Sequence, residues 1–130
     1  MYEAETRGIR IKVTPKYLSR ESAPVKNHYV WSYSIEIENV GRETVQLLSR
    51  YWHITDGTGK VQEVEGPGVV GEQPRLTPGD SYSYMSGVPL TTPSGFMRGH
   101  YVMVTDGGQT FEVAVPAFSL DSADERRVVH

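Results

Sequence analysis

Gly66, Gly68 and Gly71 have the spacing Gly-x-Gly-x-x-Gly, which is typical of dinucleotide-binding loops. In such a loop the third glycine opens a helix, and the N–H groups at the start of that helix hold a pyrophosphate. Here Pro74 and Pro78 follow the glycines closely, and proline prevents a helix from forming across this stretch. The spacing therefore does not predict a dinucleotide site.

The same glycine-rich stretch has two other interpretations. Its glycines and prolines can fix an extended connection that crosses from one sheet to the other, with a glycine at positive φ. Alternatively, its backbone N–H groups can form an anion-binding nest without a helix. The neighbouring charges oppose the second interpretation, because Glu63, Glu65 and Glu72 would repel a phosphate and face only Arg75.

We interpret the stretch as a recognition loop. Its prolines order the backbone before contact, so that docking costs little conformational entropy. We expect its apolar and charged side chains to be exposed, including those of Val69 and Val70. The candidate binding surface comprises Gly66, Pro67, Gly68, Val69, Val70, Gly71, Glu72, Gln73, Pro74 and Arg75.

His53 and Asp56 are the candidate metal ligands, because an imidazole and a carboxylate could meet at the end of a strand. Such a pair suits Co²⁺ better than Mg²⁺, which prefers oxygen ligands, although two ligands do not form a site. No serine lies in a nucleophile elbow, and Glu36 and Glu38 share one solvated strand face. We therefore assign no catalytic residue and no cofactor, and we expect a protein that is not an enzyme.

Composition limits the classes of function. The 130 residues are enough for a single domain, 1–130, and the absence of cysteine excludes disulfides and thiolate metal sites. A net charge of −3, from 13 basic and 16 acidic residues without a basic cluster, does not favour nucleic acid as a ligand. No segment has the roughly 20 apolar residues of a membrane span or the pattern of a signal peptide. We expect a cytoplasmic protein without membrane insertion.

The elements that position these residues are strands, since apolar residues recur with a period of two. A phase shift at Leu47–Leu48 predicts a bulge or a change of sheet. Asp56–Gly59 predicts a hairpin turn, and Thr77–Asp80 predicts a type II turn. The strand with apolar residues on both parities, 96–104, should be central and covered on both faces. Seven strands are expected, at 9–13, 29–38, 45–54, 61–65, 82–86, 96–104 and 111–115.

Seven strands with short turns and no cysteine pair predict an all-β fold, an immunoglobulin-like or fibronectin type III-like β-sandwich, with a small closed barrel as the alternative. Residues 121–130 are expected to form a loose tail or a short edge strand. An exposed sheet edge would be compatible with a homodimer or an added partner strand. The aromatic residues expected to anchor the core are Trp31, Tyr33, Trp52 and Phe96.

Four segments, 31–39, 47–56, 66–74 and 95–101, resemble the ApaG family, and the resemblance runs from about Tyr2 to the end of the chain. It implies a fibronectin type III-like sandwich and no established catalytic residues. In bacteria the family is associated with cobalt resistance and magnesium efflux, and often neighbours a diadenosine tetraphosphate hydrolase. Similar eukaryotic domains lie within an F-box protein and a polymerase-interacting protein.

The residues and the resemblance together predict a non-enzymatic cytosolic binding module with an unknown protein partner, linked to divalent-cation homeostasis. The alternative is a direct binder of a divalent metal or a nucleoside polyphosphate, through His53 and Asp56 or through the backbone of the glycine-rich stretch.

Overall fold

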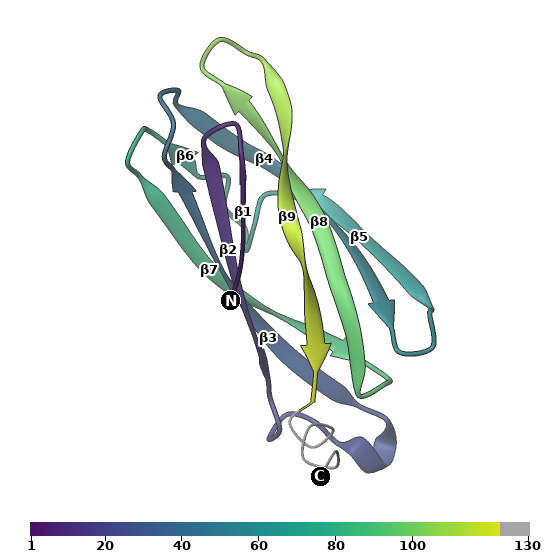
Figure 1. Cartoon of the computed structure of the whole chain (residues 1–130). Helices are drawn as coiled ribbons and strands as arrows, with labels where there is room; N and C mark the ends of the chain where they lie inside the picture. Colours follow the sequence, from purple (N-terminus) through teal and green to yellow (C-terminus); the bar gives the residue numbers. More distant parts are fainter. Residues whose placement is uncertain (123–130) are drawn as a thin grey trace.

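The computed structural model describes residues 1–122, which form two antiparallel sheets and one short 3-10 helix, η1 (Pro24–Lys26) (Figure 1). The first sheet runs in the order β1-β2-β3-β7, and the second in the order β5-β4-β8-β9 with β6 paired to β4. The strands are β1 (Tyr2–Thr6), β2 (Ile9–Tyr17), β3 (Tyr29–Asn39), β4 (Val45–Asp56), β5 (Val61–Pro67), β6 (Arg75–Leu76), β7 (Ser81–Leu90), β8 (Ser94–Thr105) and β9 (Thr110–Asp121).

The predicted sandwich is confirmed, and the closed-barrel alternative is wrong, because the sheets have separate edges. All seven expected strands are present within longer ones, and β1 and β6 are additional to the prediction. Of the predicted tail, Asp121 ends β9 and Ser122 is buried, whereas 123–130 lie outside the described residues. Among residues 1–122 no helix is long and apolar enough to span a membrane.

The core lies between the sheets and is built from alternate residues of each strand. Trp31, Tyr33 and Trp52 are buried there as expected, and Trp31 is only 1% exposed. Phe96 is a wrong prediction, since 44% of it is exposed on the outer face of β8. The alternate residues from Met97 onwards face inward, and within residues 1–122 no third layer covers the other face. Apolar residues on both parities of β8 therefore reflect strand propensity rather than burial on two sides.

The predicted bulge and turns are present. In the pairing of β4 with β8 the register shifts between Leu47 and Ser49, which leaves Leu48 as the extra residue. The turn at Thr77–Asp80 closes with an N–H to carbonyl bond of 2.9 Å from Asp80 to Thr77, and Gly79 has a φ of 94°. This turn leads from β6 in one sheet to β7 in the other. The glycine-rich stretch does not make the predicted crossing, because β5 and β6 both pair with β4.

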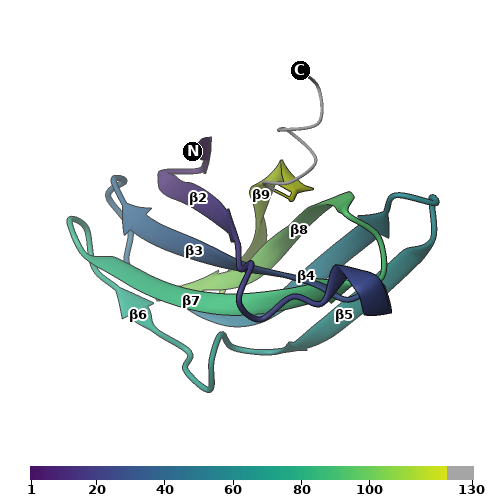
Figure 2. The ribbon, with the colours of Figure 1, turned by 90° about the horizontal axis from the view of Figure 1, so that it is seen from below.

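The two sides of the sandwich differ. On the closed side β1 and β2 lie against β9, and the backbone N–H of Ser119 donates to the hydroxyl of Tyr2 at 3.2 Å. On the open side β5 and β7 are the outermost strands of their sheets, and no strand of residues 1–122 pairs with their outer edges. Figure 2 shows β2 and β9 on one side and β5 and β7 on the other. The glycine-rich stretch begins on the open side, at the end of β5.

Candidate functional site

The glycine-rich stretch folds into a tight turn of its own. Val69 and Glu72 exchange two backbone hydrogen bonds of 2.8 and 2.9 Å across Val70 and Gly71. Both central residues have positive φ, 43° for Val70 and 82° for Gly71, as in a type I′ turn. Asparagine or glycine normally occupies the first central position, and a β-branched residue there is strained. Val70 nevertheless holds this position with 57% of its surface exposed.

The bulge in β4 anchors the turn. The Leu48 carbonyl accepts hydrogen bonds from the Gly68 N–H and the Gln73 side-chain amide, both at 2.9 Å. The Leu47 N–H donates to the Pro74 carbonyl at 3.0 Å. These bonds flank the Val70 turn on both sides, so hydrogen bonds to β4, in addition to the prolines, hold the backbone of the turn.

Arg50 of β4 holds the entrance to the turn. Its guanidinium donates to the carbonyls of Pro67 at 3.0 Å and Gly68 at 3.1 Å. The group lies over Gly66, where an added Cβ would be 3.1 Å from an Arg50 nitrogen, closer than ordinary contact. Glycine at position 66 thus makes room for the guanidinium, and Gly68 and Gly71 provide the positive φ values.

Two predicted surface residues have other roles. Val69 is fully buried, with 0% of its surface exposed, because the turn directs this side chain into the core. Arg75 is exposed but engaged, since its guanidinium donates to both carboxylate oxygens of Asp106 at 3.1 and 3.0 Å. The exposed part of the candidate surface that remains is centred on Val70, with Pro67, Gly71 and Glu72 beside it.

The backbone of the stretch is poorly suited to an anion nest. The N–H groups of Gly68, Val69 and Glu72 all donate to protein carbonyls. An anion that used these three N–H groups would have to displace bonds that also fix the turn. The geometry therefore favours the structural interpretation of the glycines over the nest.

His53 and Asp56 are not brought together. They lie three residues apart in β4, and successive strand residues face opposite sides of a sheet, so the two side chains project from opposite faces. The Asp56 carboxylate accepts bonds from the Thr58 hydroxyl, the Thr58 N–H and the Lys60 N–H, and the hydroxyl bond is the main cause that lowers its pKa. Nδ1 of His53 is buried without a hydrogen-bond partner in the described chain. Within residues 1–122 no three His, Asp or Glu side chains gather to hold a metal.

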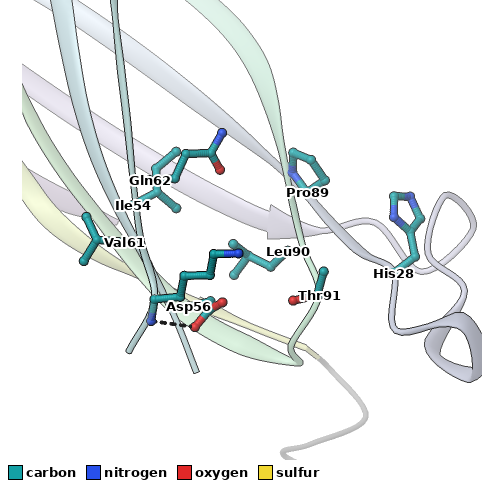
Figure 3. Close-up of a pocket in the computed structure, with 9 residues that line it drawn as sticks. His28, Ile54, Asp56, Val61, Gln62, Pro89, Leu90 and Thr91 are labelled. Atoms are coloured by element: carbon teal, nitrogen blue, oxygen red, sulfur yellow. Dashed lines mark hydrogen bonds between the residues drawn. The ribbon is translucent and has the colours of Figure 1, made fainter. Parts of the chain in front are cut away.

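A groove follows the open side between β5 and β7, and we call it the β5–β7 groove. Its wider end, about 220 Å³, lies between the β4–β5 hairpin and the end of β7. Figure 3 shows Leu90 and Thr91 between His28 and Asp56 at this end, with the Asp56 carboxylate directed to the Lys60 backbone. The narrower part, about 200 Å³, contains Arg50 and shares with the wider end Ile54, Gln62 and Pro89.

Tyrosine hydroxyls cluster between the sheets near Arg50. The hydroxyls of Tyr84 and Tyr101 are 2.6 Å apart, and Tyr33 lies close enough to influence both. Burial is the main cause that raises the pKa of Tyr101 well above its usual value, and the same holds for Tyr84. These phenols stay neutral near pH 7. Sequence reasoning missed the cluster, although Tyr82, Tyr84 and Ser86 alternate as inward-facing residues must.

These features define an antiparallel β-sandwich domain with a hydrogen-bonded, strained surface turn. The sequence model of the ApaG domain matches residues 19–105, and the chain belongs to the ApaG family. Over 130 residues, covering all of both chains, it is 61% identical to the ApaG protein of Mesorhizobium japonicum and 59% identical to that of Brucella anthropi. A crystal structure of a Bordetella pertussis protein described as ApaA is also similar. It has 46% identity and a TM-score of 0.87, over 88% of this chain and 94% of that chain.

Proposed function

We propose that this chain is a non-enzymatic cytosolic binding domain that contacts a protein partner through the Gly66–Arg75 stretch and acts in divalent-cation homeostasis. The observation that supports the contact surface most is Val70, an exposed β-branched residue at a φ of 43°. Strain of this kind persists only where the surrounding structure enforces it, and it concentrates at functional sites. An exposed valine on a fixed turn also offers an apolar contact that loses little entropy on docking.

The link to cobalt and magnesium rests on the family resemblance rather than on a metal site. A protein contact is consistent with the family's link to cation handling and with the lack of a cluster of metal ligands in residues 1–122. A domain can alter cation handling through a partner without binding the ion. Direct binding of Co²⁺, Mg²⁺ or diadenosine tetraphosphate remains the alternative. Direct binding is the less favoured alternative, because loop N–H groups and the Asp56 carboxylate already have hydrogen-bond partners within the domain.

The variant Val70→Asn tests the contact surface without threatening the fold. Asparagine suits the left-handed backbone, so the domain should stay folded while the apolar tip becomes polar. We expect reduced capture of the native partner from cytosol, and lower cobalt tolerance when the variant replaces the wild-type protein. Val25→Asn is the matched control, because Val25 is 96% exposed on η1 and outside the stretch.

If a folded Val70→Asn protein captures the partner and supports cobalt tolerance as well as wild type does, the turn is not the contact surface. Calorimetry of the wild-type chain with Co²⁺, Mg²⁺ and diadenosine tetraphosphate distinguishes direct ligand binding from a protein contact. Binding heat that survives Val70→Asn would replace the protein-contact proposal with direct ligand binding.

A further inference from the structure

Strand β7 is an unprotected sheet edge. Its ten residues carry no charged side chain, and its pairing with β3 runs from Ser81 to Leu90 without a register shift. Natural proteins usually block an exposed edge with charges, prolines or bulges, because free backbone groups there invite another strand. Pro89 is the one such device in β7 and lies near its end. Most of the edge is therefore open to a partner strand.

The neighbouring edge, β5, is protected in the usual way. Its seven residues include Glu63 and Glu65, and the strand ends at Pro67. Apart from the two-residue β6, the remaining edge strands are β1 and β9, which lie against each other on the closed side. An additional strand would therefore pair more readily with β7 than with β5. This holds above all for a negatively charged strand, which Glu63 and Glu65 of β5 would repel.

The first sheet also ends one strand short of covering β5. Gln62 and Val64 face inward beside Ile54 and Trp52, with which they pair across the ladder. Ile54 and Trp52 are buried, whereas Gln62 is exposed and Val64 is half-buried. A strand added beside β7 would extend the first sheet over these two side chains and complete the sandwich on its open side.

Arg50 supplies a charge that the domain does not balance. Its guanidinium lines the β5–β7 groove with Ser86 and Val64, and two backbone carbonyls are its hydrogen-bond partners. No carboxylate of residues 1–122 forms an ion pair with it, whereas Arg7 and Arg75 each have one carboxylate partner and Arg10 has two. A half-buried guanidinium with unused donors is well suited to a carboxylate.

We propose that an extended segment of another protein pairs with the edge of β7 as an additional strand, and that an aspartate or glutamate of this segment reaches Arg50 in the β5–β7 groove. The inference deepens the proposed function, on which it rests, by naming the chemistry of the partner. Backbone pairing would supply affinity, and the acidic side chain would fix the register.

A library of random peptides of about eight residues, displayed on phage and selected against the full chain, tests the proposal. We expect the selected peptides to alternate β-formers with polar residues and to be enriched in Asp or Glu at one position. The peptide with Gln in place of that acid should bind about tenfold more weakly. On the Arg50→Gln variant, the Gln peptide and the acidic peptide should bind with equal affinity, because the guanidinium that distinguishes them is gone.

A matched pair of variants locates the site on β7. Ser86→Glu would place a competing carboxylate in the groove, and we expect it to weaken peptide binding at least about tenfold. Met85→Glu adds the same charge one residue away on the opposite face, where Met85 is exposed and the carboxylate does not enter the groove, and it should weaken binding clearly less than Ser86→Glu does. Ser86→Gln is the control for side-chain size, and circular dichroism shows that each variant is folded.

Selection of no peptide, or of peptides without acidic enrichment, would overturn the inference, as would equal effects of Ser86→Glu and Met85→Glu. Dimerisation of the chain that Ser86→Glu abolishes would also overturn it, by showing a second copy at the edge. If these tests fail while Val70→Asn still abolishes partner capture, the strand inference fails alone. If peptides bind as expected but Val70→Asn leaves capture intact, the proposed loop surface fails instead.

Discussion

The closed and open sides of the sandwich differ in how their side chains are packed. On the closed side Phe118 is buried and its ring lies 6.2 Å from Tyr2, 5.9 Å from Tyr33 and 6.3 Å from Trp52, centroid to centroid. On the open side the inward-facing Arg50 and Gln62 line the β5–β7 groove. The difference teaches that one side can hold the fold while the other leaves polar groups and a sheet edge uncovered.

The largest expected effect breaks the closed side. Phe118→Ala should lower the free energy of unfolding by about 3–5 kcal/mol, because it removes a buried ring and leaves a cavity. Val64→Ala on the open side should cost about 1 kcal/mol or less, since that side chain is only half-buried. Urea denaturation measures both. Similar losses for the two variants would contradict the division.

The buried tyrosine hydroxyls on the open side should make the free energy of unfolding depend on pH. The folded pKa of Tyr101 is raised above the unfolded value of about 10. As the pH rises past that value, the unfolded chain loses this proton first, so stability present below about pH 10 falls at about 1.4 kcal/mol per pH unit. In Tyr101→Phe this part of the slope should vanish. Urea unfolding between about pH 9 and pH 11 tests this, and equal slopes in both proteins would refute it.

The smallest effect concerns the strained turn on the open side. Val70→Asn should raise the free energy of unfolding by about 0.5–1 kcal/mol, because asparagine tolerates positive φ and little apolar burial is lost. Val25→Asn should leave it unchanged within about 0.5 kcal/mol. A destabilised Val70→Asn protein would show that the valine stabilises the turn through contacts rather than straining it.

Local patterns predicted most of the scaffold. The alternation in 29–38 specified β3 and its buried Trp31, and the phase shift at Leu47–Leu48 specified the bulge. The hairpin turn that begins at Asp56 also formed as expected, with Gly59 at positive φ. These features depend on residues close in sequence, whose backbone preferences and side-chain alternation act before distant strands meet.

The errors concern which side chains the fold covers. Phe96 and Val69 were assigned the wrong exposures, because burial depends on which face the other sheet covers and on how the turn enters the core. His53 and Asp56 were paired by sequence distance, although strand geometry places them on opposite faces. The Gly66–Arg75 surface stays a prediction, and the exposure of Val70 and the anchoring by Arg50 depend on contacts between segments.

The sequence alone determined the all-strand character of the chain, its turns, its bulge and the absence of a helix after Gly71, because these follow from local preferences for φ and from alternation. Tertiary structure decided that the Leu48 carbonyl and Arg50 would anchor the turn in which Val70 is strained and exposed. It also decided that β7 would lie at an open edge. Both outcomes require strands distant in sequence to pair and pack, and no local pattern specifies which edge stays free.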